Sequence, residues 1–243
     1  MHILFVVAHP EPNSFTGALL EKAKAVAAEA GASFEVSDLY AEKFDPVLGR
    51  GDFSTVWNPD YFSVQDEQAA AERSDAFSDD IGREQARVAK ANLIVFLFPL
   101  WWGGPPAVVK GWFDRVMSYG FGYMDGARYE RGLFRGRHAM LCIPTGGTAD
   151  RFTDAGTYGS IERVLWPLKH CALAYIGLTQ LDDFIAYATP RVDAAQRAAY
   201  LEAWGAHLRA GVDRARREAA PQPLVRGHVG VAPLAFEPHV TSA

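Results

Sequence analysis

The residues best suited to chemistry lie in a short loop of two tryptophans, two glycines and two prolines, Trp101 to Pro106. The loop follows the apolar run Leu93 to Phe98 and precedes a segment with helical spacing. Flat apolar side chains can stack on a planar ring, and glycines let the backbone approach that ring closely. The indoles fall outside any helical or strand period, which argues against a role in core filling alone. A flat redox cofactor is therefore the first hypothesis for this loop.

Two further loops follow predicted strands. After the amino-terminal apolar run comes His9 to Thr16, where hydroxyls and free amides can bind a phosphate at the start of a helix. Capping of that helix by Asn13 or Ser14 is the simpler alternative. After Ala139 to Ile143 comes Pro144 to Thr148, whose consecutive N–H groups are typical of an anion cradle. Because the carboxyl ends of parallel strands converge on one crevice, the three loops together indicate a single ligand site.

Other ligand classes find no support in the motifs. The glycine patterns GxGxxG and Walker A are absent, which disfavours a Rossmann nicotinamide site and a nucleotide triphosphatase. The two cysteines, Cys142 and Cys171, have no spacing suited to zinc or to a disulfide framework. We expect both thiols to be buried and reduced, and we expect no metal site.

The composition of the chain argues against some kinds of binding partner. The chain has 243 residues, 49% of them hydrophobic and 22% charged, which is ordinary for one main globular domain. The formal net charge of -5 and the lack of a basic cluster argue against nucleic acid. The amino terminus has no basic start and only a short apolar run, so we expect a cytoplasmic protein without a membrane span.

Apolar runs alternate with helical patterns along the chain. Continuous apolar runs rich in β-branched residues predict strands buried on both faces at Ile3 to Val7, Leu93 to Phe98, Ala139 to Ile143 and Ala174 to Leu178. A fifth strand is predicted at Ser33 to Ser37, where Phe34 and Val36 alternate with polar neighbours. Helical spacing predicts helices at Ala18 to Ala30, Asp79 to Ala91, Pro105 to Met117 and Asp193 to Arg217. This alternation favours an α/β fold with a doubly wound, five-stranded parallel sheet and helices on both faces. Leu39 to Ser78 is expected to form an extended surface loop before the helix that begins at Asp79.

The chain divides at the end of the last predicted helix. Residues 1–217 are predicted to form the catalytic domain, and residues 218–243 an irregular, proline-rich carboxyl-terminal extension. The apolar residues of this extension require a surface to lie on, and we expect it to pack on a partner subunit.

The motifs resemble a known family. HPEPNSF, FPLWWGGPPAVVKGWFDRV, GFGY, TGG and LWPLKHCALAYIGL are similar, in the same order over residues 1 to 215, to the flavodoxin-like NAD(P)H:quinone oxidoreductases of the DT-diaphorase type. The resemblance implies a flavodoxin-like fold and FAD, in preference to FMN, held by a homodimer. It also implies two-electron hydride transfer from NAD(P)H to a quinone or a nitro- or azo-aromatic, by ping-pong exchange at one flavin site.

The resemblance also implies roles for particular residues. With the phosphate argument above, it gives as FAD-binding His9, Ser14, Phe15, Thr16, Leu100, Trp101, Trp102, Gly103, Thr145, Gly146, Gly147 and Arg197. It implies a substrate pocket of Trp102, Phe152 and Tyr158, with Tyr123 supplied by the other subunit. The catalytic groups would be Tyr158 and the amides of Gly146 and Gly147, because hydride arrival leaves negative charge near flavin N1 and O2 that donors must stabilise.

Several positions depart from the family pattern. Phe152 and Tyr158 stand where a tyrosine and a histidine are expected, and Phe152 cannot donate a hydrogen bond. Gly103 replaces an aromatic residue, Asp125 replaces a pocket tyrosine, and Ser63 replaces a glutamine that contacts FAD. These differences predict a wider or more polar pocket than in the family.

Two other functions stay open at the level of sequence. A flavin-bearing regulatory subunit of a transporter would use the carboxyl-terminal extension for docking. A flavodoxin-like electron carrier with FMN is less favoured, because such carriers are usually short and strongly acidic.

Overall fold

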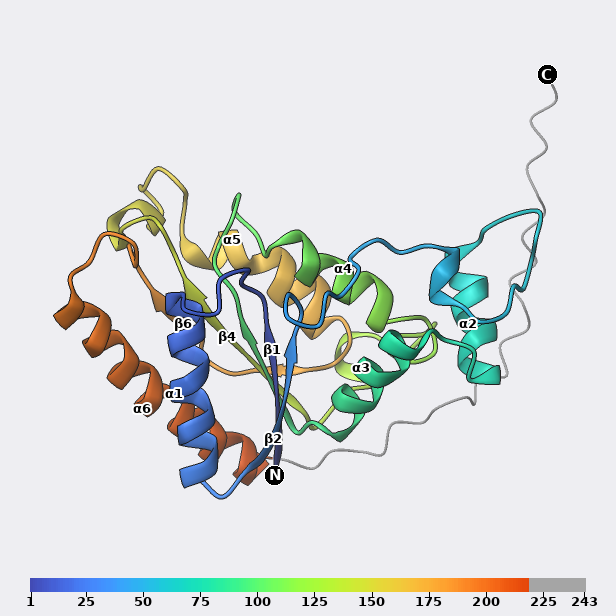
Figure 1. The fold of residues 1–243 in the computed structure, drawn as a ribbon, viewed down its shortest axis with the longest axis horizontal. Helices are drawn as coiled ribbons and strands as arrows, with labels where there is room; N and C mark the ends of the chain where they lie inside the picture. Colours follow the sequence, from blue (N-terminus) through green and yellow to red (C-terminus); the bar gives the residue numbers. More distant parts are fainter. Residues whose placement is uncertain (219–243) are drawn as a thin grey trace.

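A parallel sheet with the strand order β2-β1-β3-β4-β5 forms the centre of the structure, a computed structural model that describes residues 1–218 (Figure 1). The strands are β1 His2–Val7, β2 Ser33–Asp38, β3 Leu93–Leu97, β4 His138–Pro144 and β5 Thr179–Gln180. A short sixth strand, β6 Phe184–Ala186, pairs with the carboxyl-terminal half of β4, whereas β5 pairs with its beginning. Together β5 and β6 occupy one edge position, so the sheet is the predicted five-stranded, doubly wound arrangement.

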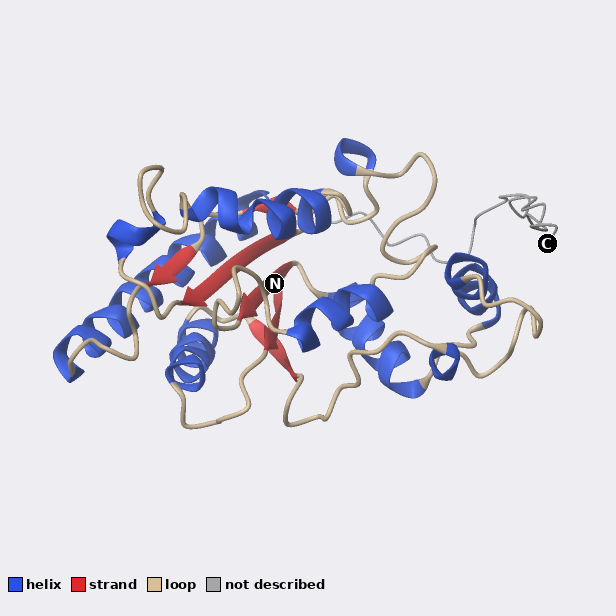
Figure 2. Cartoon of the chain, turned by 90° about the horizontal axis from the view of Figure 1, so that it is seen from above, coloured by secondary structure: helices blue, strands red, loops and turns tan. Residues whose placement is uncertain are grey.

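Helices cover both faces of this sheet (Figure 2). Their bounds are α1 Phe15–Glu29, α2 Val64–Ser74, α3 Asp79–Lys90, α4 Ala107–Val116, α5 Ile161–Leu168 and α6 Ala194–Glu218. Short 3₁₀ turns lie at Arg50–Asp52, Tyr129–Arg131 and Ala149–Phe152, and a π-helical turn at Lys169–Ala174 continues α5. α1 and α6 pack on one face, and α3, α4 and α5 pack on the other.

The central strands explain why two cores form. Successive side chains of a strand point to opposite faces, so Leu4 and Val6 of β1 join the core under α3, α4 and α5. Ile3 and Phe5 join the core under α1 and α6. All four side chains are fully buried, which is why β1 has to be apolar at every position rather than at alternate ones.

One predicted strand was wrong. Ala174 to Leu178 does not form a strand: the π-helical turn runs to Ala174, and Gly177, with φ of 97°, ends the helical path. The edge strand begins only at Thr179. A short apolar run cannot distinguish a buried strand from the buried side of a helix, and here the run completes the apolar side of α5.

The long segment before α3 was also predicted incompletely. Leu39 to Ser78 contains the helix α2, which is polar along most of its length. Its buried Glu67 accepts hydrogen bonds from the backbone N–H of Trp57 at 2.8 Å and of Asn58 at 3.2 Å. The helix is therefore fixed by a buried carboxylate that organises the preceding loop, and such a contact leaves no apolar period in the sequence.

Of the two cysteines, Cys142 is buried as expected, but Cys171 is exposed. Within the described residues no cluster of histidine, cysteine or carboxylate side chains could hold a metal ion. No helix of this same part of the chain is long and apolar enough to cross a membrane. Residues 219–243 of the predicted extension lie outside the described residues.

Helix α4, which follows the tryptophan loop, is held in place by contacts with α3 and with the segment between β2 and α2. Its buried Arg115 donates to Asp52 at 3.0 Å and to Asp80 at 2.7 Å. One turn earlier Gly111 lies against Pro46, so closely that an added Cβ would be 2.2 Å from the Pro46 carbonyl oxygen. The tryptophan loop thus leads into a helix that cannot shift without breaking a buried ion pair and a close backbone contact.

Two glycines within helices test this contact. Gly111→Ala forces α4 away from Pro46, and we expect it to lower the free energy of unfolding by about 1–3 kcal/mol. Gly82 of α3 has no atom within 4 Å of its added Cβ, so Gly82→Ala should raise stability by about 1 kcal/mol through helix propensity. Urea denaturation of both variants measures the difference, and an unchanged or higher stability for Gly111→Ala would contradict the contact.

Candidate functional site

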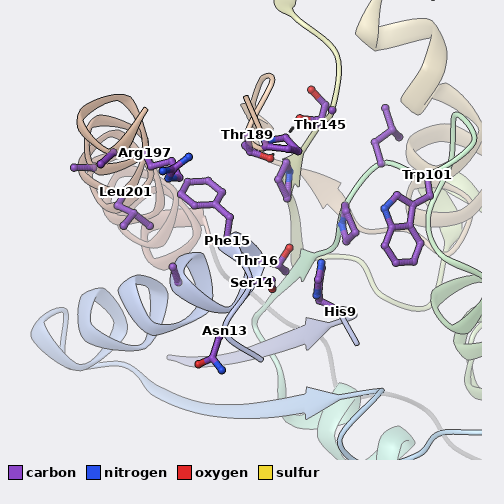
Figure 3. Close-up of a pocket in the computed structure, with 18 residues that line it drawn as sticks. His9, Asn13, Ser14, Phe15, Thr16, Trp101, Thr145, Thr189, Arg197 and Leu201 are labelled. Carbon is purple, nitrogen blue, oxygen red and sulfur yellow. Dashed lines mark hydrogen bonds between the residues drawn. The ribbon is translucent and has the colours of Figure 1, made fainter. Parts of the chain in front are cut away.

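A cavity of about 790 Å³ lies at the carboxyl end of the sheet (Figure 3). Its volume is in the range typical of small-molecule pockets. The loops after β1, β3 and β4 and the first turns of α1 and α6 form its walls. Nine predicted cofactor-binding residues line it, namely His9, Ser14, Phe15, Thr16, Leu100, Trp101, Thr145, Gly146 and Arg197. The convergence of the three loops, predicted from strand order alone, is confirmed.

The amino terminus of α1 forms one wall. The Ser14 hydroxyl accepts a hydrogen bond from the backbone N–H of Gly17 at 3.2 Å, so Ser14 caps the helix as the simpler alternative proposed. Capping leaves the backbone N–H groups of Phe15 and Thr16 without an acceptor anywhere in residues 1–218. These two amides stand at the positive end of a helix of 15 residues, a favourable position for a phosphate.

His9 and Trp101 lie next to each other on one side of the cavity (Figure 3). Their ring centroids are 6.1 Å apart. His9 Nδ1 lies 3.0 Å from the backbone nitrogen of Glu11, and when it accepts that hydrogen bond the neutral ring carries its proton on Nε2. His9 can then donate from Nε2 to an anionic oxygen in the cavity.

The tryptophan loop is a two-residue hairpin turn. Trp101 and Gly104 exchange two backbone hydrogen bonds of 3.0 Å, and the residues between them, Trp102 and Gly103, have φ of 52° and 72°. Positive φ at both central positions defines a type I′ turn. The positive φ at this position therefore explains why a glycine stands at Gly103, and sequence comparison alone did not reveal that reason.

Trp102 occupies an unfavourable backbone conformation for a large side chain. Its indole is fully exposed within the described part of the chain, and neither Trp102 nor Gly103 lines the cavity.

The loop after β4 presents free amides. Thr145 anchors it by donating its N–H to Ala186 at 2.8 Å and its hydroxyl to the Gly147 carbonyl at 2.8 Å. The N–H groups of Gly146 and Gly147 donate to no group in the described part of the chain. This loop therefore offers two adjacent donors beside the cavity, as the anion-cradle hypothesis predicts.

Phe152 and Tyr158 lie behind this loop rather than on the cavity wall. An added Cβ on Gly147 would be 2.8 Å from the Phe152 ring and 3.0 Å from the Tyr158 ring. Phe152 is buried between Tyr158 and Tyr187, at centroid distances of 5.1 and 5.7 Å. Tyr158 is half exposed, and its hydroxyl accepts from Arg151 at 3.4 Å. Burial raises the pKa of Tyr187, and the charge of Glu162 adds to that increase, so this phenol stays neutral.

Tyr123 lies in a second, apolar groove of about 590 Å³ beside α4 and the π-helical turn. Burial, and then the neighbouring Tyr175, raise the pKa of Tyr123. Asp125 accepts from Tyr119 at 3.3 Å and from Arg128 at 2.9 Å, so it is not a free polar group of a pocket. Tyr123 and the first cavity are separate within one chain.

Half of the residues that line the cavity were not predicted from the sequence, and several of these lie on α6. The additional lining residues are Asn13, Ala18, Pro99, Pro144, Thr189, Pro190, Ala194, Ala198 and Leu201. Arg197 was predicted, and it donates to the backbone oxygen of Val192 while facing the Phe15 side of the cavity (Figure 3). The remaining α6 residues are small and apolar, which the sequence presents as an ordinary helix.

Known proteins share this architecture. A family described as flavodoxin-like fold matches residues 1–208. The mouse ribosyldihydronicotinamide dehydrogenase [quinone] is 37% identical over 85% of this chain and 90% of its own length. The guinea pig NAD(P)H dehydrogenase [quinone] 1 is 36% identical over 84% of this chain and 75% of its own. A crystal structure of a proposed quinone reductase from Klebsiella pneumoniae superposes with a TM-score of 0.82 at 34% identity, covering 86% and 83% of the two chains.

The strained turn gives a stability prediction. Trp102→Asn creates the Asn-Gly pair that type I′ turns prefer, and we expect it to raise the free energy of unfolding by about 1 kcal/mol. Trp102→Phe keeps the strain and should leave stability unchanged. Urea denaturation of protein stripped of small molecules compares the two. A loss of stability in Trp102→Asn would mean that the indole makes contacts that stabilise the chain.

Proposed function

This chain belongs to the flavodoxin-like NAD(P)H:quinone oxidoreductase family, and we propose that it uses FAD to reduce quinones or related planar acceptors with NAD(P)H. It is an oxidoreductase, as its relatives are. The two substrates would exchange by ping-pong at one flavin site. One observation carries the proposal: the backbone N–H groups of Phe15, Thr16 and Gly146 lie at one cavity, with that of Gly147 next to it, and none of the four has an acceptor within residues 1–218.

The residues present suit a flavin. The amides of Phe15 and Thr16, with His9, would hold the phosphates. The amides of Gly146 and Gly147 would donate to the oxygen-bearing edge of the ring, next to the apolar wall of Leu100 and Trp101. The cavity continues past α1 to α6, which gives room for an adenosine end, and this favours FAD over FMN.

Catalysis needs positioning and charge stabilisation rather than a covalent bond to the protein. Bound FAD would supply a ring that takes a hydride from NAD(P)H and gives it to the acceptor. Gly146 and Gly147 hold donors where negative charge develops, and Tyr158 adds a phenol behind them. Trp102 offers a flat face for a planar acceptor. Nitro- and azo-aromatics share that flatness with quinones.

The substrate pocket requires a second copy of the chain. Tyr123 does not line the cavity of its own chain, and Trp102 is exposed at that cavity's edge loop. In a homodimer, Tyr123 of one copy would face Trp102 of the other, with the apolar groove covered by the interface. Sedimentation of the flavin-bound protein as a monomer at micromolar concentration would contradict this arrangement.

The nicotinamide substrate has to be identified by comparing candidates in an assay. The relatives' names include both NAD(P)H and ribosyldihydronicotinamide, so NADH, NADPH and the riboside all belong in the assay. No structural observation favours a transporter subunit or an electron carrier. The cytoplasmic location stays a prediction from the sequence.

The first functional prediction concerns the cofactor. The purified protein should be yellow, release FAD on denaturation and lose its flavin absorbance when NAD(P)H is added without oxygen. A small quinone should restore the absorbance, and initial rates should give the parallel double-reciprocal lines of a ping-pong sequence. Mass analysis distinguishes FAD from FMN. Protein without flavin that NAD(P)H does not bleach would overturn the proposal.

The second concerns Tyr158. Tyr158→Phe removes a partly exposed donor, so we expect the rate of flavin reduction to fall about tenfold, less than for a buried oxyanion donor. Tyr40→Phe, at an exposed tyrosine outside both cavities, is the matched control. Stopped-flow absorbance measures both. An unchanged rate in Tyr158→Phe would show that the backbone amides stabilise the charge without it.

A further inference from the structure

The three successive carbonyl groups of the loop after β4 are all held by one short segment, residues 188–191. The Thr145 carbonyl accepts from the Thr189 N–H at 3.0 Å, and the Gly147 carbonyl accepts from the Ala188 N–H at 2.8 Å. Between them, the Gly146 carbonyl accepts from Nη1 of Arg191. Thus the segment that holds the loop supplies two neutral backbone donors and one charged side chain.

The charged contact acts on a specific peptide group. The Gly146 carbonyl and the Gly147 N–H belong to one planar unit, so a partner that fixes the carbonyl also fixes the direction of the N–H. A charged donor on the carbonyl also polarises the unit and makes its N–H a stronger donor. That Gly147 N–H bonds to nothing within the described residues. Arg191 therefore acts on a donor whose own partner has to come from outside the chain.

Arg191 is free to serve this contact. Its guanidinium is exposed and has no carboxylate within 4.0 Å in residues 1–218. The nearest acidic residue in sequence, Asp193, is engaged in accepting from the Gln196 N–H at 2.7 Å as α6 begins. Its positive charge is therefore directed at the Gly146 carbonyl and is not neutralised by an ion pair.

The backbone holds Arg191 in place. Its N–H donates to the Ala188 carbonyl at 2.8 Å, which closes a tight turn through Thr189 and Pro190. Ala188 has φ of 54°, a conformation that alanine rarely adopts. The same Ala188 binds the Gly147 carbonyl, so turn and loop fix each other. Such mutual support indicates a preformed arrangement rather than a chance surface contact.

We propose that Arg191 is a positioning residue for the reaction: by holding and polarising the Gly146–Gly147 peptide, it strengthens the donor that stabilises charge on the flavin. This inference rests on the proposed function.

Four single substitutions in the FAD-bound protein test it. Arg191→Gln removes the charged donor, and Arg191→Lys restores a charge at the same place. Arg151→Gln removes a nearby charge that contacts Tyr158 and not the peptide, and Arg209→Gln removes a remote charge paired with Glu29. The readouts are the two-electron midpoint potential, the rate of reduction, the dissociation constant of NAD(P)H and the NMR shift of the Gly147 amide proton.

We expect Arg191→Gln to lower the equilibrium constant of flavin reduction about tenfold, which corresponds to a midpoint potential about 30 mV more negative. The rate of reduction should fall as well. The Gly147 amide proton should shift upfield, and NAD(P)H affinity should stay unchanged. Arg191→Lys should recover most of the potential, Arg151→Gln should lower it by less, and Arg209→Gln should not change it.

The outcomes separate this inference from the proposed function. Wild-type protein that binds no flavin, or that NAD(P)H does not reduce, would defeat the proposed function itself. A working wild type with unchanged potential and Gly147 shift in Arg191→Gln would defeat only the role of Arg191. Weakened NAD(P)H binding with unchanged potential would also overturn it, because Arg191 would then bind substrate rather than position the peptide.

Discussion

The site depends on one constraint, the backbone N–H groups that have no acceptor within the chain in the first turn of α1 and in the loop after β4. β1 and β4 run into loops at the same edge, and the chain there leaves the amides of Phe15, Thr16, Gly146 and Gly147 without acceptors in the described structure. Donors grouped at two places around one cavity suit a ligand with oxygen atoms at two separated places. A molecule with phosphates at one end and a carbonyl-bearing ring at the other meets that requirement.

The rest of the fold keeps these donors in place. Arg115 and the close contact of Gly111 hold α4, and α4 in turn holds the end of the tryptophan loop. On the opposite side, the turn at residues 188–191 binds the carbonyls of the loop after β4. Both walls are thus held by contacts within the chain, which lowers the cost of binding and directs the donors at the place where charge develops. The strain at Trp102 lies on an exposed part of this edge.

Sequence patterns predicted the layers of the fold because the buried strands have to be apolar at every position. The same rule failed at Ala174 to Leu178, where a short apolar run belongs to a helical turn, and at α2, where a buried Glu67 replaces an apolar core. At the site, most of the residues predicted next to strand ends line one cavity, because strand order alone brings them together. Arg191 could not be predicted: its importance comes from a contact with Gly146, 45 positions away in sequence, that only folding creates.

The most direct test of the account follows the backbone amides themselves. In ¹H–¹⁵N spectra of isotope-labelled, flavin-free protein, addition of FAD should shift the resonances of Phe15, Thr16, Gly146 and Gly147 and slow their exchange with water. Gly31 follows the end of α1 and Gly82 lies in α3, and neither lines the cavity, so their amide resonances should stay unchanged. Bound FAD that leaves the Gly146 and Gly147 resonances where they were would contradict the claim that these amides hold the ring.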